Sequence, residues 1–292
     1  MRPTAIVGPG GSFNRIGKMS TAIPAVSIKS PARKLAHIRS LLLAAGYCVA
    51  SAQAAGAVDW YTGDKTSEPD YAPSIVLDTS VSATTTQSGF GAAAITGALD
   101  GNLRQDGFRY RVEGIAGDYN YFTTLPAIPP ATIGVGKKIY ANQEDGGVLG
   151  GYGWNTRNWS FLLLGGVELS NTNLSYPDPN NPTAGFYIGA KIVGEFYGNP
   201  THDTMLSGYG SFSTTNSEYY SRFKAGYRIW ENVFFGPEVL ALGNRFYSEY
   251  RAGVHLTGLT IGQFAFGVSG GATSSRVTGS GGYGILDVRV GF

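Results

Sequence analysis

The chain has 292 residues, a length that suits one large domain or two modest ones. Charged residues make up 14% of it, against roughly 25% in soluble domains, whereas glycine (43 residues) and aromatic residues (13%) are abundant. No run of 18 or more apolar residues occurs, which excludes a membrane-spanning helix. If the chain lies in a membrane, it must therefore form a closed β-barrel, because open sheet edges cannot face lipid.

The first 54 residues predict an export signal. A basic region, a short apolar run and a small-residue cleavage site follow one another; they are Lys29–Arg39, Leu41–Ala50 and Ala52–Ala54. We expect cleavage after Ala54, so that residues 1–54 are an N-terminal extension with signal peptide and residues 55–292 are one barrel domain. A buried first helix of a soluble domain is disfavoured, because Ala-Gln-Ala is a poor end for a core helix.

Removal of this leader reverses the net charge. Seven of the 22 Lys and Arg residues precede residue 55, but none of the 20 Asp and Glu residues do, so the processed chain carries a charge of −5. Nucleic-acid binding then has no electrostatic basis. The sole cysteine, Cys48, lies in the leader behind the bulky Tyr47, which argues against a lipid-modified cysteine. We expect neither a disulfide nor a thiol nucleophile in the processed protein.

From residue 74 onward, segments with alternating polarity are separated by turn residues. Twelve candidate strands follow, an even number as in single-chain bacterial barrels: 74–83, 88–99, 108–124, 147–154, 159–172, 184–198, 204–214, 219–230, 233–243, 246–257, 259–270 and 281–292. Ten or fourteen strands stay open, because 56–64 and 131–141 could each pair. Long external loops are expected at Leu125–Gly146 and Asn173–Thr183. Short turns are expected at the other end, near Asn155–Asn158, Asn199–Asp203, Glu231-Asn232 and Gly258.

The alternation separates apolar from ionic side chains. Three segments show it clearly: Phe108, Tyr110 and Val112 opposite Arg109, Arg111 and Glu113; Phe223, Tyr227 and Ile229 opposite Arg222, Lys224 and Arg228; and Phe246, Tyr250 and Val254 opposite Tyr247, Glu249, Arg251 and His255. A soluble sandwich alternates too, but with its apolar face inside. Strands of about 10 to 14 residues exceed the soluble average of about 5–6. Together with Trp154, Trp159 and Trp230 near segment ends, they favour an antiparallel transmembrane barrel with an apolar outside and a polar lumen.

The chain ends on an alternating strand, Gly284 to Phe292. Apolar residues including the terminal Phe292 share one face of this strand, and Asp287 and Arg289 share the other. The pattern resembles the terminal β-signal of outer-membrane proteins. This resemblance implies that the barrel-assembly machinery reads Phe292, and that the protein resides in outer-membrane lipid.

Catalytic and metal motifs are weak. Only His202 and His255 remain in the processed chain, and no serine lies two residues either side of His255. A hydrogen-bonding role in the lumen is therefore favoured for His255 over catalysis. Two distant histidines without cysteine do not make a metal site, and Gly134–Lys138 lacks the spacing of a phosphate-binding loop. We predict no enzyme activity, metal or cofactor.

Lumen carboxylates are expected to pair with lumen cations, bracing the interior or lining a pore. The acidic members are Glu168, Glu195, Glu238 and Glu249, and the basic members are Arg109, Arg111, Lys191, Arg222, Lys224, Arg228 and Arg251.

Several short motifs resemble a known family. They are Gly236-Pro237-Glu238-Val239, Ala241-Leu242-Gly243-Asn244, Tyr250-Arg251-Ala252-Gly253 and His255-Leu256-Thr257-Gly258-Leu259, with Gly153-Trp154, Gly226-Tyr227-Arg228 and Gly282-Tyr283-Gly284 in support. Together they resemble the BcsS family of secreted proteins associated with bacterial cellulose biosynthesis, well over residues 147–292 and loosely over 56–146. The resemblance implies a role in cellulose production or secretion, and it carries no catalytic residues to transfer.

The sequence is thus interpreted as an outer-membrane barrel accessory to cellulose export, possessing a lumen too narrow for the main conduit, since wide channels belong to barrels of 16 or more strands. Cellulose or cellulose-secretion components are the expected partners. Glucan contacts are expected at Arg222, Arg228, Glu238, Tyr247, Glu249 and Arg251. The alternatives are a small-solute porin-like channel and, less favoured, an outer-membrane lipid-modifying enzyme, which would need a Ser–His pair.

Overall fold

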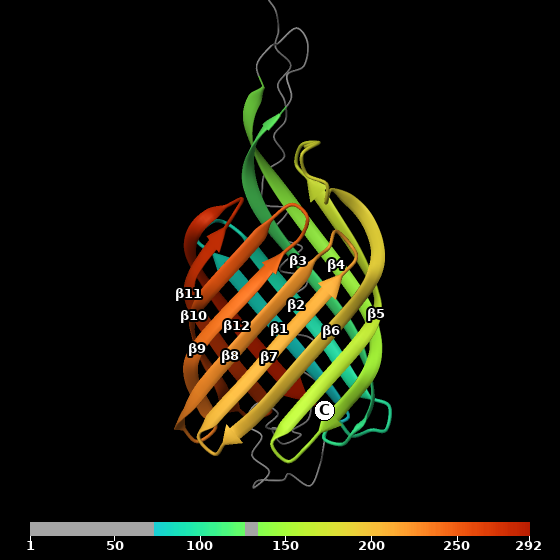
Figure 1. Ribbon diagram of the computed structural model, residues 1–292, viewed down its shortest axis with the longest axis vertical. Coiled ribbons are helices and arrows are strands. Elements are labelled where there is room, and N and C mark those ends of the chain that lie inside the picture. Colours follow the sequence, from blue (N-terminus) through green and yellow to red (C-terminus); the bar gives the residue numbers. More distant parts are fainter. Residues whose placement is uncertain (1–72, 126–133) are drawn as a thin grey trace, which may run out of the picture. The chain divides into compact units, whose positions relative to one another are not determined.

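The computed structural model describes residues 73–125 and 134–292. The predicted signal peptide, its cleavage site and the candidate strand 56–64 lie outside these residues. In the described part, twelve strands form one closed antiparallel barrel: each strand pairs with its neighbours in sequence, and β1 pairs with β12 (Figure 1). The predicted all-β, twelve-stranded barrel is confirmed. No helix among the described residues is long and apolar enough to cross a membrane.

The strands follow one another with short connections. Their bounds are β1 Ile75–Thr84, β2 Gly89–Ala98, β3 Gly107–Leu125, β4 Val135–Asn155, β5 Trp159–Leu174, β6 Gly185–Thr201, β7 Thr204–Ser213, β8 Tyr219–Trp230, β9 Val233–Gly243, β10 Ser248–Ile261, β11 Phe264–Ser275 and β12 Gly279–Gly291.

The two ends of the barrel differ in their connections. At the end where the chain terminates, here named the Phe292 end, four turns of two or three residues join the strands after β4, β6, β8 and β10. The two longest connections at the opposite end are residues 126–134 and 175–184. The short turns after β4, β6 and β8 and the long connection after β5 agree with the prediction, whereas the connection 99–106 at the Phe292 end has eight residues. Trp154, Trp159 and Trp230 all lie beside turns at the Phe292 end, where an interface girdle would sit.

The predicted boundaries of the fourth strand are wrong. β4 begins at Val135 rather than at residue 147, and it pairs with β3 from Val135–Leu125 to Gly153–Gly107. Residues 135–146 of the predicted loop Leu125–Gly146 are therefore strand, and residues 135–141 of the alternative strand 131–141 belong to β4. β3 and β4 rise above the neighbouring strands at the opposite end as a two-stranded ribbon (Figure 1). The polar run Gln143–Gly147 suggested a loop, but its backbone is paired on both sides.

The predicted turn near Gly258 is also wrong. β10 continues to Ile261, and Gly258 lies at a bulge where the pairing with β11 shifts between Thr257 and Leu259. Gly258 has a φ of +94°, and a Cβ there would meet the Asn232 carbonyl oxygen at 2.0 Å, so glycine is required by both conformation and space. The turn itself is at residues 262–263.

The barrel is apolar outside and ionic inside. On β3, Phe108 and Val112 are 63% and 51% exposed, whereas the intervening Arg109 and Arg111 are buried. β8 and β10 repeat this arrangement, as predicted. One predicted outward residue departs from it: Phe246 precedes β10, and its ring packs inward on Tyr121, with the ring centroids 4.8 Å apart. An apolar exterior around a charged interior is the polarity of a transmembrane barrel, not of a soluble sandwich.

A charge placed on the outer wall tests this polarity. Val112 lies midway along the wall, so Val112→Arg is expected to destabilise the barrel by about 2–4 kcal/mol in lipid vesicles. The control is Leu99→Arg in the exposed connection at the Phe292 end, expected to cost about 0–1 kcal/mol. Guanidinium unfolding in vesicles measures both, and equal costs would contradict the transmembrane orientation.

Candidate binding chamber in the lumen

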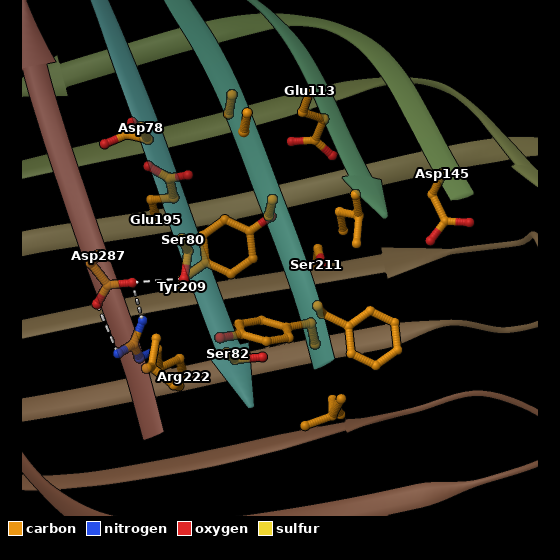
Figure 2. Close-up of a pocket in the computed structure, with 18 of the residues that line it drawn as sticks. Asp78, Ser80, Ser82, Glu113, Asp145, Glu195, Tyr209, Ser211, Arg222 and Asp287 are labelled. Atoms are coloured by element: carbon orange, nitrogen blue, oxygen red, sulfur yellow. Dashed lines mark hydrogen bonds and ion pairs between the residues drawn. The ribbon is translucent and has the colours of Figure 1, made fainter. Parts of the chain in front are cut away.

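The lumen contains a cavity of about 390 Å³ (Figure 2). One side of this chamber is lined by long ionic side chains, prominent among them Arg222, Lys224 and Arg251. The other side carries small residues from β1 and β2. The chamber therefore has one wall of long ionic side chains, here named the braced wall, and one wall of small side chains that leave the cavity unfilled.

Four ionic side chains form the centre of the braced wall, here named the Arg222 network: Arg222, Lys224, Glu238 and Asp287. Arg222 contacts Glu238 at 2.8 Å and Asp287 at 2.9 Å, and Lys224 contacts Asp287 at 3.1 Å. β8, β9 and β12 supply these residues. Two cations and two carboxylates balance, so the low-dielectric interior holds paired rather than isolated charges.

Hydroxyl groups complete the Arg222 network. Ser80 donates to Asp287 at 2.9 Å, Ser269 donates to Glu238 at 2.9 Å, and Tyr283 donates to the other Glu238 oxygen at 3.0 Å. β1, β11 and β12 supply these three residues. Both carboxylates are thus hydrogen-bonded as well as ion-paired, which a buried charge requires.

Further ion pairs brace the rest of the lumen. Lys191 of β6 bridges Glu113 of β3 at 2.7 Å and Glu168 of β5 at 2.5 Å. Arg111 contacts Glu195 across the lumen at 2.5 Å. Arg251 pairs with Glu249 at 2.7 Å, as predicted. Two other predicted cations do not pair with the predicted carboxylates: Arg109 contacts Asp100, and Arg228 donates hydrogen bonds to backbone carbonyls.

Aromatic residues pack at the opposite end of the lumen. Tyr119 stacks between Tyr121 and Tyr247, with centroid separations of 6.1 and 5.9 Å. The Tyr121 hydroxyl donates to Asp178 at 2.9 Å and accepts a hydrogen bond from Asn181 at 3.1 Å, which ties down the connection 175–184. At the Phe292 end, Leu103 packs against inward-facing Val76 and Ala98. The chamber lies between these two packed layers.

The six predicted glucan contacts do not form one site. Arg222, Glu238, Glu249 and Arg251 belong to ion pairs of the braced wall, and Tyr247 stacks on Tyr119. Arg228 lies near the Phe292 end, where it donates to the carbonyls of His202 and Glu231 in adjacent turns. His255 is buried and hydrogen-bonds Thr257 at 2.9 Å and the Ala225 carbonyl at 3.2 Å, as its predicted structural role requires.

Sequence reasoning missed the uncharged polar residues that line the chamber. Ser82 of β1, together with Tyr209 and Ser211 of β7, lines the cavity (Figure 2). The sequence did carry a signal for them, because every second residue of β7 from 207 to 213 bears a hydroxyl group: Ser207, Tyr209, Ser211 and Ser213. These uncharged residues drew less attention than the arginines.

Two carboxyl groups lie close together near the opposite end. Gln143 donates to both Asp145, at 2.8 Å, and Glu218, at 3.3 Å, in the turn before β8. Burial raises the pKa of the Glu218 carboxyl to about 8, with further increases from the negative charges of Asp145 and Glu168. Glu218 therefore retains its proton at neutral pH, which limits repulsion in this acidic corner.

Comparison with known proteins gives a family. The profile of the family described as cellulose biosynthesis protein BcsS matches residues 76–292, from the second residue of β1 to the end of the chain. The chain belongs to this family. The resemblance inferred from the motifs of β9 and β10 is thereby confirmed.

Solved structures similar to this BcsS-family barrel are barrels of low sequence identity. The KdgM porin has 10% identity and a TM-score of 0.37, covering 74% of this chain and 99% of its own. OprB of Pseudomonas putida at low pH has 8% identity and a TM-score of 0.30, covering 75% and 91%. CdiB from Acinetobacter baumannii has 8% identity and a TM-score of 0.32, covering 75% and 60%. A search of curated proteins gave no match.

Removing Arg222 tests the bracing role. Arg222→Met leaves Glu238 and Asp287 with Lys224 as their one remaining cation in the Arg222 network, and we expect a loss of about 3–5 kcal/mol of unfolding free energy. The matched control is Arg157→Met in an exposed turn, expected to change stability by less than about 0.5 kcal/mol. Guanidinium unfolding of both variants in the same vesicles measures the difference. Equal stability of the two would show that the network does not brace the BcsS-family barrel.

Glu218 gives a pH-dependent prediction. Its pKa is raised from an ordinary value of 4.5 to about 8. The folded state thus binds this proton more tightly than the unfolded state. The unfolding free energy that depends on this proton is fully present below pH 4.5 and is lost as the pH rises to about 8. Glu218→Gln cannot ionise and should lose less stability over this window. The measurement is the unfolding midpoint of both proteins between pH 4.5 and 9, and parallel curves would refute the raised pKa.

Proposed function

We propose that this BcsS-family barrel is a non-catalytic accessory protein of bacterial cellulose production or secretion, located in the outer membrane. Membership of the family over residues 76–292 is the observation that carries the proposal. The apolar exterior and charged lumen support a membrane location, because such a surface requires lipid. The basic and apolar N-terminal segment supports export across the inner membrane.

The lumen supports an accessory role over that of polymer conduit. Ion pairs cross it from β3 to β6 and from β8 to β12, and an aromatic layer fills its opposite end. Wide aqueous channels belong to barrels with about 16 strands or more. Passage of a continuous glucan chain would require these paired charges to separate in a low-dielectric interior, at high cost.

The C-terminal strand supports recognition by the barrel-assembly machinery. Phe292 lies at the β1–β12 seam, where its amide donates to the Ile75 carbonyl and its carbonyl accepts from the Ser74 amide, both at 2.8 Å. The strand carrying the proposed signal is thus the one that closes the barrel. Other components of cellulose secretion are the proposed functional partners.

The contacts of His255 support the absence of catalysis. Nε2 donates to the Ala225 carbonyl and Nδ1 shares a hydrogen bond with the Thr257 hydroxyl, and both side chains are buried away from the residues that line the chamber, so this pair is not open to a substrate. Within residues 73–125 and 134–292, no group of three or more His, Cys, Asp or Glu side chains is arranged to hold a metal ion.

Deletion of the gene tests the proposed function. We expect an in-frame deletion to reduce cellulose output, measured as cellulase-sensitive glucan per cell, and a plasmid copy to restore it. Fractionation should place the wild-type protein in the outer membrane with heat-modifiable migration on gels. Unchanged cellulose output in the deletion strain, under conditions where the wild type makes cellulose, would overturn the proposal.

A further inference from the structure

The chamber has space because one part of its wall is built from small residues. Ala92 and Ala94 of β2 face inward beside Ser80 and Asp78 of β1, with which they pair. The facing strands contribute long arginine, lysine and glutamate side chains instead. Small residues at these positions leave a volume of about 390 Å³, which falls within the range of small-ligand pockets, roughly 300–1,000 Å³.

Three hydroxyl groups that line the chamber, one from β1 and two from β7, are available to a ligand. Ser82, Tyr209 and Ser211 line the chamber, and their hydroxyls form no hydrogen bond with any residue in the described part of the chain. Tyr209 and Tyr220 meet edge to face, with ring centroids 5.5 Å apart and an interplanar angle of 79°. The chamber thus offers donors, acceptors and aromatic surface to a ligand inside it (Figure 2).

The charges around the chamber disfavour an anionic ligand. Every cationic side chain that lines it contacts a carboxylate: Arg111 with Glu195, Lys191 with Glu113 and Glu168, Arg222 and Lys224 with Asp287, Arg251 with Glu249, and Arg289 with Asp78. A carboxylate or phosphate entering the chamber would have to displace one of these partners. A neutral ligand leaves all of the pairs intact, and its hydroxyls can donate to the lining carboxylates.

We propose that the chamber binds a short neutral oligosaccharide, namely a glucan segment, through Ser82, Tyr209 and Ser211. The choice of glucan rests on the proposed function, whereas the choice of a neutral, hydroxyl-rich ligand rests on the chamber itself. Sugar hydroxyls pair with the three side-chain hydroxyls, and the C–H face of a sugar ring packs against the tyrosine rings. Arg222 lies beside Tyr209 in the pairing of β7 with β8, and its ion pairs with Glu238 and Asp287 hold this part of the chamber in place. Arg222 and Glu238, predicted as glucan contacts, therefore position the site.

Calorimetric titration of the full-length processed protein, folded in detergent micelles, tests the site with cellotetraose as the probe. The wild type is expected to bind cellotetraose and to bind trigalacturonate, an anionic oligosaccharide, at least about tenfold more weakly. Ser211→Leu removes one of the three hydroxyls and puts a bulky apolar side chain into the chamber beside Tyr209, so it should abolish cellotetraose binding. Tyr209→Phe keeps the ring and removes one hydroxyl, so a few-fold to about tenfold loss is expected.

Ser221→Leu is the matched control. It makes the same substitution on the exposed face of the neighbouring strand β8, and binding should be unchanged. Heat-modifiable gel migration verifies that each variant is folded. The inference is overturned if the folded wild type does not bind cellotetraose, if trigalacturonate binds as tightly, or if Ser211→Leu binds like Ser221→Leu.

These results are separable from the genetic test. Reduced cellulose output in the deletion strain without cellotetraose binding would refute the chamber site alone. Binding by the purified protein with unchanged cellulose output would refute the proposed function alone.

Discussion

Ion pairs across the lumen connect strands that are distant in the sequence. Arg222 joins β8 to β9 and β12, and Lys191 joins β6 to β3 and β5. Because water is largely displaced from these positions, each charge is tolerated only while its partner is present. The arrangement of the lumen, including the space left in it, therefore depends on this mutual neutralisation. The outer wall needs no such pairing, because its apolar side chains are stable in contact with lipid alone.

Bracing and the proposed binding belong to different residues of one chamber. The long ionic side chains hold fixed positions because each is engaged by one or more partners, which lowers the cost of ordering them around a ligand. The small residues of β1 and β2 provide the volume, and Tyr209 and Ser211 of β7 provide the ligand contacts. A chamber of about 390 Å³ between two packed layers suits capture of a short segment better than transit of a polymer.

This division bears on how such a barrel would assist cellulose production. With the proposed site for a short glucan segment, the protein would hold part of the product while another component conducts it. Glu218 keeps its proton at neutral pH and so adds no negative charge there. The acidic corner near the opposite end therefore stays compatible with an uncharged ligand. The C-terminal strand pairs with β1 at the seam and so closes the barrel that contains the chamber.

The sequence by itself indicated a barrel of about twelve strands, the polarity of its two faces and the family, because period-two alternation and short motifs are local properties. The closed pairing settled the number at twelve, where ten or fourteen had stayed open. It also indicated that lumen charges would pair, since unpaired charges cannot remain there. Tertiary structure alone decided which charges meet, because partners such as Arg222 and Asp287 are set by barrel closure and register. The same holds for the continuation of β4 through its polar residues, the bulge at Gly258 and the inward turn of Phe246. Alternation specifies a face but not a neighbour, so the chamber formed by β1, β2 and β7 emerges only when the sheet closes.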